Sequence, residues 1–366
     1  MNSDLPRLNI VVNADSFAYM YKYFLQPIEL SATIEYWENN ANKVFTEAAV
    51  IDIRGSGSAH NKMKSIGVRF NKKIDNATFQ IVNTQQALPG HNLDALQDVR
   101  LRNSGNDDPF TQFKDLALTE FLIDYEMDME LKYGTPFQVF VNNRYYGLLN
   151  FRTENTVIAL SDLLQVNQAD ITMMKIDLDN GNLEHREGDE VICDDLRLAI
   201  KNEDIRTLES LIDVENFMDY IIFEDYVSNA DWPHNNVRIY SIAGSKFRFL
   251  LYDLDLSLKF TKQQILPRME YLKDDLSKMY QIFREKEEGF IESFETRQKM
   301  WYQKFSPNHF NSVVDGFVNV YRSEIKYKIS KYNYPSSTLE WNLSVDDMRR
   351  SFEQNDKNNR SKYNLN

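Results

Sequence analysis

The sequence predicts an α+β protein in which a strand-rich first part is followed by a helix-rich second part. Up to about residue 154, short apolar runs and residues of alternating polarity dominate, as in half-buried strands. Beyond this point, apolar residues recur mostly at spacings of three and four, as on helices. Because the two patterns are segregated along the chain, we expect lobes at residues 1–154 and 155–366, and not a doubly wound sheet.

The composition is that of a folded protein with a large core. The chain has 366 residues, of which 42% are hydrophobic and 13% aromatic, and this excludes a disordered chain. The net charge of −13 disfavours nucleic-acid binding, because an acidic surface repels phosphates. A metal-chelated nucleotide is still compatible, since a cation can bridge carboxylates and phosphates. The single cysteine, Cys193, is expected to be a small buried residue.

Two kinds of targeting segment are not expected in this sequence. Residues 1–6 show no basic stretch followed by an apolar run, so we expect no signal peptide. No apolar run approaches about 18 residues, so we expect no membrane span. The composition leaves the compartment and the oligomeric state open.

In the first part, strands are expected at residues 8–12, 28–36, 48–53, 66–70, 79–82 and 99–101. A helix should begin near Thr111, because apolar residues follow at helical spacing. Residues 137–141 and 145–151 then predict a hairpin that turns at Asn142 and Asn143. The polar block at residues 102–107 directly precedes the expected helix, so it would either cap that helix or meet a ligand.

In the second part, helices are expected at residues 161–164, 193–200, 205–212 and 214–227, and again within 273–331 and 345–352. One hairpin is expected between them, from strands at 237–240 and 247–252 that turn at Ala243 and Gly244. The Asn- and Lys-rich tail that starts at Gln354 is expected to fray.

The first motif with chemical meaning lies at residues 229–236, after the long apolar helix. Asp231 precedes Asn236 by five positions, the spacing of the protein-kinase catalytic loop, in which the Asp orients the attacking hydroxyl and the Asn holds a metal ion. Because Trp232 and Pro233 cannot continue the helix, the chain should turn there and present Asp231 in a cleft between the lobes. Asp, Asn and Pro are also common in turns, which is the alternative interpretation.

The second motif is the pair Asp253 and Asp255, which follows a buried strand. Residues two apart in an extended chain point to the same side, so both carboxylates could face one cation. The alternative is a solvated strand end.

The third motif is a small-residue loop at residues 54–58, followed by basic residues. Arg54, Gly55 and Ser56 begin a loop whose backbone N–H groups could contact phosphates, with Lys64 and Arg69 as counter-charges. A flexible surface hairpin explains the same pattern. The five histidines are scattered, and no pair has metal-ligand spacing.

Taken in order, these motifs resemble the spore-coat CotH kinase family. Five blocks within residues 8–257 carry the resemblance: 54–70 with Lys64-Ser65, 102–107 followed by Lys114-Asp115, the hairpin 142–150 with Tyr145 and Gly147, the segment 229–236, and the strand end 252–255. Met63 departs from the family pattern at the first Lys, and two further departures matter more. Leu256-Ser257-Leu258 replaces an aromatic residue and glycines, and Thr153 stands where a Glu is expected, with Glu154 one step away.

The resemblance implies an atypical protein-kinase-like fold and ATP-dependent phosphoryl transfer to Ser or Thr of a protein, with Mg²⁺ or Mn²⁺. It also implies a coat, cell-surface or secreted setting. The residues that it assigns are Asp231 for catalysis, Asn236, Asp253 and Asp255 for the metal, and Arg54, Gly55, Ser56, Lys64, Arg69 and Glu154 for the nucleotide. Because of these departures, a non-catalytic surface or coat scaffold is one alternative. A kinase-like enzyme that transfers AMP or ligates an amino acid is another.

Overall fold

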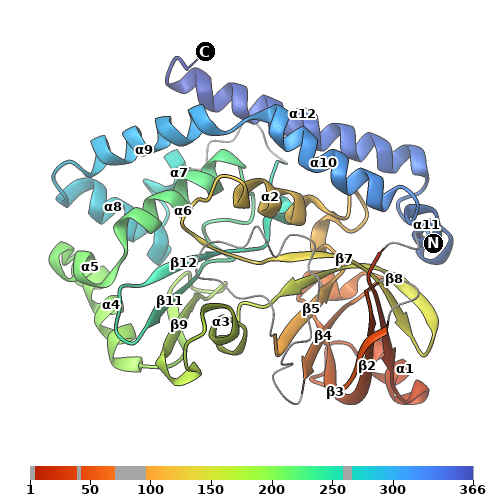
Figure 1. The fold of residues 1–366 in the computed structure, drawn as a ribbon. Coiled ribbons are helices and arrows are strands. Elements are labelled where there is room, and N and C mark those ends of the chain that lie inside the picture. Colours follow the sequence, from red (N-terminus) through yellow and green to blue (C-terminus); the bar gives the residue numbers. More distant parts are fainter. Residues whose placement is uncertain (1–4, 39–42, 71–95, 259–265, 366) are drawn as a thin grey trace. The chain divides into compact units, whose positions relative to one another are not determined.

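The computed structural model describes residues 5–38, 43–70, 96–258 and 266–365 (Figure 1). The chain divides into two compact units: unit 1 holds residues 1–124, 132–165 and 311–347, and unit 2 holds residues 125–131, 166–310 and 348–366. In this division residues 155–165 and 311–347 belong to unit 1. The lobe boundary near residue 154 stays a prediction. The mixed α+β class is confirmed, with strands dominant early and helices dominant late.

Unit 1 is built on a closed barrel of seven strands (Figure 1). In sheet order they are β1 (Arg7–Val11), β2 (Glu29–Trp37), β3 (Lys43–Arg54), β4 (Ser65–Phe70), β5 (Asp98–Arg102), β8 (Arg144–Thr153) and β7 (Gly134–Val141). All neighbours are antiparallel except β1 and β7, whose parallel pairing closes the barrel. The strands expected in this part are confirmed, except that residues 79–82 lie outside the described residues.

Alternating polarity decides which side of each barrel strand is buried. On β2, Ala32, Ile34 and Tyr36 are buried while their neighbours are partly exposed. On the inner side the aromatic residues stack: the ring of Phe137 lies 5.6 Å from that of Tyr36 and 4.7 Å from that of Phe151. The predicted hairpin is also confirmed, because β7 and β8 turn at residues 142–143, which both adopt positive φ.

The helices of unit 1 are α1 (Ala14–Lys22), α2 (Lys114–Ile123), α3 (Val157–Leu164), α11 (Ile325–Tyr332) and parts of α10 (Pro307–Tyr321) and α12 (Thr338–Lys362). The sequence pattern did not predict α1, because of its residues only Met20 is buried and an apolar stripe is therefore weak. Helix α2 begins at Lys114, slightly later than expected. Its first N–H group is capped from a distance, because Asp107 Oδ2 accepts the Lys114 N–H at 3.0 Å.

Unit 2 contains a five-stranded sheet that the sequence predicted only in part. Its order is β10 (Leu183–Glu187), β9 (Ile171–Ile176), β11 (Arg238–Ile242), β12 (Arg248–Leu251) and β6 (Glu130–Leu131). The β11–β12 hairpin was expected, but β9 and β10 were missed. The reason is that β9 is buried almost throughout and therefore lacks alternation, whereas β10 is short and mostly polar.

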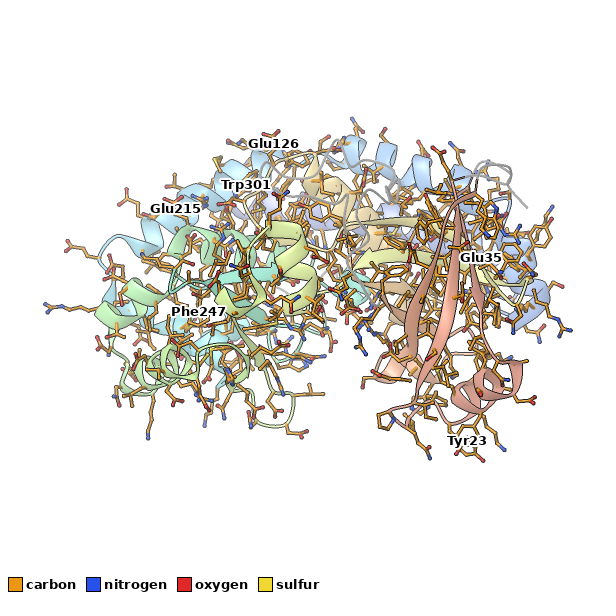
Figure 2. The ribbon with its side chains drawn as sticks, turned by 60° about the horizontal axis from the view of Figure 1, so that its bottom comes forward. Tyr23, Glu35, Glu126, Glu215, Phe247 and Trp301 are labelled. Carbon is orange, nitrogen blue, oxygen red and sulfur yellow. The ribbon has the colours of Figure 1, made fainter. Side chains whose placement is uncertain are left out.

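The helices of unit 2 are α4 (Glu190–Asn202), α5 (Ile205–Leu211), α6 (Val214–Tyr226), α7 (Leu266–Met269), α8 (Asp275–Lys286), α9 (Phe290–Lys304) and parts of α10 and α12. Helix α6 forms the centre of this core, since all its residues from Asn216 to Tyr226 are buried. Figure 2 labels Phe247 and Trp301 within this unit, and both side chains are buried. Cys193 on α4 is buried as expected.

The expectation that the tail frays from Gln354 is wrong. Helix α12 continues to Lys362, because its last turns pack on unit 2. The ring of Phe352 stacks on that of Phe310 with 4.0 Å between centroids, and Arg360 donates to the backbone oxygen of Phe305 at 2.7 Å. Among the described residues no helix is both long and apolar enough to cross a membrane.

The cap of α2 gives a stability prediction. Asp107 is fully buried and accepts from the N–H groups of Thr111 and Lys114, so its loss leaves both donors unsatisfied. We expect Asp107→Ala to lower the free energy of unfolding by about 1–2 kcal/mol. Asp107→Asn keeps one acceptor oxygen and should cost less. Chemical denaturation measures both variants, and an Asp107→Ala protein as stable as wild type would contradict the capping role.

Candidate functional site

Asp231 lies in a turn that begins directly after α6. Its neighbour Trp232 is fully buried and donates from Nε1 to the Tyr220 hydroxyl at 3.0 Å, which fixes the turn to the helix. Asp231 Oδ2 accepts from the side-chain amides of Asn235 at 2.8 Å and Asn236 at 2.9 Å. Asp231 and Asn236, the two residues of the predicted motif, are therefore in direct contact. Neutral donors hold Oδ2, and His234 Nε2 lies 4.0 Å from Oδ1.

The electrostatic surroundings of Asp231 favour its protonated form more than water does. Burial raises the pKa of Asp231, and the nearby carboxylate of Asp253 raises it further, while the amide of Asn235 acts in the opposite direction. The side chain is 28% exposed, so it is half-buried and still accessible. This combination of fixed orientation and raised pKa suits a carboxylate that accepts a proton.

The segment that carries Asp253 and Asp255 runs beside this turn. The Leu258 N–H donates to the Val227 oxygen at 2.8 Å, and the Ala230 N–H lies 3.4 Å from the Leu256 oxygen. The premise that this segment is extended is wrong: Asp253 has a left-handed backbone conformation, and Asp255 lies in a 3₁₀ turn at Leu254–Leu256. Alternation along a strand therefore does not place the two carboxylates on the same side of the chain.

The two segments carry side-chain oxygen atoms of the kind that hard divalent cations prefer. Asn236, Asp253 and Asp255 offer oxygen atoms, which Mg²⁺ prefers, and Asn236 directs its NH₂ group to Asp231 so that its amide oxygen is turned away. No group of three His, Cys, Asp or Glu side chains in metal-binding geometry occurs among the described residues. Mg²⁺ does not require one, since one or two carboxylates, waters and substrate phosphates commonly complete its shell.

In unit 1, the small-residue loop connects β3 to β4. Gly55 has φ of 125°, and a side chain there would bring Cβ within 2.6 Å of Ser58 Oγ, so this position requires glycine. The loop is a short 3₁₀ turn at Gly57–His60. It is thus an ordered structure rather than an open hairpin.

Lys64 lies inside this loop, where its ammonium is enclosed. Lys64 Nζ donates to the backbone oxygen of Ala59 at 2.6 Å and lies 3.3 Å from that of Asn61. It also sits 3.6 Å from the ring centroid of Phe24 and 5.0 Å from that of Tyr21. The residue is 4% exposed, and burial lowers its pKa. Its observed contacts hold the loop together.

Asn103 joins this loop to the polar block at residues 102–107. Its amide donates to the oxygens of Met63 at 2.7 Å and Ser58 at 3.2 Å, and its own oxygen accepts from Ser65 Oγ at 2.9 Å and the Gly105 N–H at 3.1 Å. Asn103 is fully buried. Two segments that are separate in the sequence are therefore fastened together by one side chain.

A cluster of buried charges surrounds Glu154 in the same unit. Glu154 Oε1 lies 2.5 Å from Arg100 Nε and 3.0 Å from Arg54 Nη1, and Oε2 lies 3.1 Å from Lys132 Nζ. Arg54 also contacts Asp98 at 2.9 Å. We call these five residues the Glu154 cluster. Arg54 and Glu154, both predicted for the nucleotide, are thus brought together, but as partners of each other.

The chain as a whole matches a known family. The model of the CotH kinase protein family covers residues 51–358. The chain belongs to this family. No curated protein matches the sequence. Membership in the CotH kinase protein family implies that the chain is a kinase, and the matched range contains every residue predicted above for the metal, the nucleotide and catalysis.

The CotH kinase residues expected to contact the nucleotide do not all gather at the loop. Arg69 forms an exposed ion pair with Glu29 at 2.8 Å, and it lies four residues along β4 from Ser65, roughly 13 Å away. The roles of Arg54, Gly55, Ser56, Lys64, Arg69 and Glu154 toward a nucleotide stay predictions.

Several charged residues of the site were missed from the sequence. Arg100, Asp98 and Lys132 complete the Glu154 cluster, yet none was predicted. The signal was present on β5, where Asp98, Arg100 and Arg102 alternate with the buried residues Val99 and Leu101. The alternation of charged and apolar residues can be read from the sequence. The partners of the charged residues cannot, because they come from distant segments of the chain.

The Glu154 cluster predicts a large loss of stability when its central charge is removed. Glu154→Gln leaves three cations around a neutral side chain, and breaking buried pairs in this way typically costs 3–5 kcal/mol, so we expect a loss of about that size. Glu35→Gln is a matched control, because Glu35 on β2 pairs with Lys43 at the surface (Figure 2) and should cost less than about 1 kcal/mol. Equal losses in the two variants would contradict the importance of the cluster.

The same cluster predicts a dependence of stability on pH. Burial alone would raise the pKa of Glu154, but Arg100, Lys132 and Arg54 outweigh it and hold this pKa well below its usual range. Its stabilisation is therefore complete above the unfolded value of about 4.3 and is lost as the pH falls through the folded pKa. The stability difference between wild type and Glu154→Gln should shrink in urea titrations below about pH 4. A difference that grows on acidification would contradict this assignment.

Proposed function

We propose that the protein is an ATP- and Mg²⁺-dependent kinase with a kinase-like fold that phosphorylates Ser or Thr of a protein substrate. The observation that supports this most directly is the carboxylate of Asp231, which two amides orient beside the segment of Asp253 and Asp255. By the family resemblance, the substrate would be a coat or surface protein.

In this proposal Asp231 acts on the substrate hydroxyl. Its carboxylate accepts a hydrogen bond from the Ser or Thr hydroxyl and takes the proton as the hydroxyl oxygen bonds to the γ-phosphorus and ADP leaves. Asn235 and Asn236 keep Oδ2 fixed, so the substrate hydroxyl would bind at Oδ1, which lies 4.0 Å from His234 Nε2.

The metal would be held by Asn236 and Asp255, with Asp253 beside them. When bound, Mg²⁺ or Mn²⁺ neutralises charge on the transferred phosphoryl group. Backbone N–H groups at Gly55 and Ser56 would contact the nucleotide phosphates. Three cations fully engage the carboxylate of Glu154. At this position, backbone groups would therefore bind the nucleotide base in place of the Glu154 side chain.

The proposal is tested by intact-mass analysis of candidate protein substrates after incubation with ATP and Mg²⁺. A kinase adds a phosphoryl group, an AMP transferase adds a nucleotide, and a ligase adds an amino acid, so the added mass separates the three reactions. A scaffold adds nothing. Thermal unfolding with millimolar Mg-ATP is a second measurement, because a nucleotide that binds the folded state raises the melting temperature. No shift and no added mass would contradict the proposal.

Asp231→Asn should abolish most of the transfer while it preserves binding. The substitution keeps the shape of the side chain and removes its charge, so we expect a folded protein with near-normal Mg-ATP binding and transfer reduced by at least about 10²-fold. The rate of phosphoryl transfer and the melting temperature are measured for the variant and for wild type. A lower melting temperature with intact transfer would show that Asp231 only stabilises its turn.

Asp255→Asn should act on metal-dependent binding instead. If Asp255 holds the metal, we expect the Mg²⁺-dependent part of the melting-temperature shift with ATP to disappear, since the ligand charge is lost. The shift produced by ATP without metal is the control and should change little. Mg-ATP binding equal to that of wild type would rule out this metal assignment.

A further inference from the structure

A cavity of about 590 Å³ lies within unit 2, lined by residues of α4, of α8 and of the start of β10. None of the residues that line it belongs to the segments that carry Asp231, Asp253 and Asp255. Its volume is typical of pockets that hold a small organic molecule, which range from roughly 300 to 1,000 Å³. The proposed phosphoryl transfer makes no use of this cavity, so it is a candidate site for a second ligand.

The floor of the cavity is apolar and held in place. It is formed by Leu183, Ile200 and Ile282, which are at most 4% exposed. Asp275 fixes one corner, because its Oδ2 accepts the Leu183 N–H at 2.8 Å while its Oδ1 accepts from Lys278 Nζ at 3.0 Å. A floor of this kind favours a ligand with an apolar side chain.

The wall that α4 contributes carries positive charge. Arg197 and Lys201 both line the cavity, and they lie one turn apart on the same face of the helix. Arg197 uses one terminal nitrogen for Asp194 on its own helix, and its other nitrogens form no ion pair with the described residues. Lys201 has no ion pair within the described part of the chain. This wall can therefore bind a carboxylate.

The wall that α8 contributes offers acceptors. Gln281 and Glu285 are again one turn apart on a shared helix face. Gln281 donates from Nε2 to the backbone oxygens of Met269 at 2.6 Å and Leu272 at 3.0 Å, which leaves its Oε1 as an acceptor. Glu285 makes no ion pair with any described residue. Together these two side chains can bind an ammonium group.

The remaining charges of the lining are already neutralised. They form three ion pairs: Lys278 with Asp275 at 3.0 Å, Glu184 with Arg186 at 3.3 Å, and Glu203 with Lys286 at 2.7 Å. The charges left over for a ligand are therefore opposite in sign and lie on different helices. This arrangement is complementary to a zwitterion whose apolar part rests between its two charged ends.

The spacing of the two walls sets the length of the ligand. A single amino acid carries its ammonium and its carboxylate on the same carbon, so the two charges are too close together to serve both helices. The axes of packed helices lie about 8–10 Å apart. An extended chain of three residues spans roughly 10 Å. A zwitterion of this length is a free tripeptide, and its middle side chain would lie over the floor.

We propose that this cavity is a binding site for a free peptide of about three residues with an apolar side chain in the middle. The peptide carboxylate contacts Arg197 and Lys201 on α4. The peptide ammonium contacts Gln281 and Glu285 on α8. This inference does not depend on the proposed kinase activity, because it requires neither nucleotide nor metal.

The test is calorimetric titration of the protein, without nucleotide, with the peptide Ala-Leu-Ala that has both termini free. We expect binding at one site. Blocking both termini by acetylation and amidation removes two ion pairs and should weaken binding roughly 10-fold or more. Ala-Ala-Ala keeps both charges but loses the apolar contact, so it should bind at least about fivefold more weakly.

Two variants assign each end of the peptide to its wall. Lys201→Met and Glu285→Gln should each weaken binding of free Ala-Leu-Ala roughly fivefold, the upper range for an exposed ion pair. Peptides blocked at one end complete the cycle. The acetylated peptide lacks the ammonium, so it should be insensitive to Glu285→Gln and still respond to Lys201→Met, and the amidated peptide should show the reverse.

Lys246→Met is the matched control. Lys246 is an exposed lysine of unit 2 in the turn between β11 and β12, outside the cavity, so its loss removes the same charge without touching the site. Peptide affinity should stay within about twofold of wild type. The melting temperatures of all variants are recorded to show that each is folded.

The outcomes are decisive in each direction. A wild type that does not bind Ala-Leu-Ala at millimolar concentration overturns the inference, and so does equal binding of the free and the fully blocked peptide. Unchanged affinity in both Lys201→Met and Glu285→Gln would place the peptide elsewhere. Asp231→Asn should bind the peptide like wild type, and a loss there would show that the peptide binds at the proposed catalytic site instead. Peptide binding in a protein that transfers no phosphoryl group would leave this inference standing and contradict only the kinase proposal.

Discussion

The burial of one carboxylate, Glu154, determines much of the geometry of unit 1. Removing a carboxylate from water costs several kcal/mol unless cations replace the lost hydration. Three cations do so here: Arg54 from the end of β3, Arg100 from β5, and Lys132 just before β7. The end of β8 is thereby bound to two other barrel strands. Because the small-residue loop starts at Gly55, directly after Arg54, the same interaction fixes where that loop begins.

Strand β5 connects this cluster to the loop and to α2. Its polar side carries three charged residues, and each one has a different partner, since Asp98 pairs with Arg54, Arg100 pairs with Glu154, and Arg102 approaches Asp115. The opposite side is fully apolar and packs inward. The charged side of β5 thus connects the Glu154 cluster to Asp115 of α2.

The sequence could predict features that depend on residues close together in the chain. It could not predict those that depend on contacts between distant segments. Strands with alternating polarity, the hairpin at residues 142–143 and the buried helix α6 follow from local patterns and were predicted correctly. The contact between Asp231 and Asn236 was also accessible, because it lies within a single turn. Strand β9 was missed because burial on both faces removes alternation, and the tail was misjudged because the contact between Phe352 and Phe310 is invisible in its own composition. The partners of Glu154 and Arg102 come from distant segments, and no local pattern specifies them.

The two central carboxylates of the protein illustrate how surroundings assign opposite roles to the same chemical group. Glu154 is enclosed by cations, which hold its pKa well below its usual range. Asp231 is oriented by neutral amides, while burial and the neighbouring Asp253 raise its pKa. An arginine in place of Asn235 or Asn236 would orient Asp231 as well, but it would also lower its pKa and weaken it as a base. Amide donors solve both requirements, since they fix the direction of the carboxylate and leave it able to take a proton. The amide partners of Asp231 Oδ2 thus distinguish this carboxylate from that of Glu154, whose three ion-pair partners are all cations.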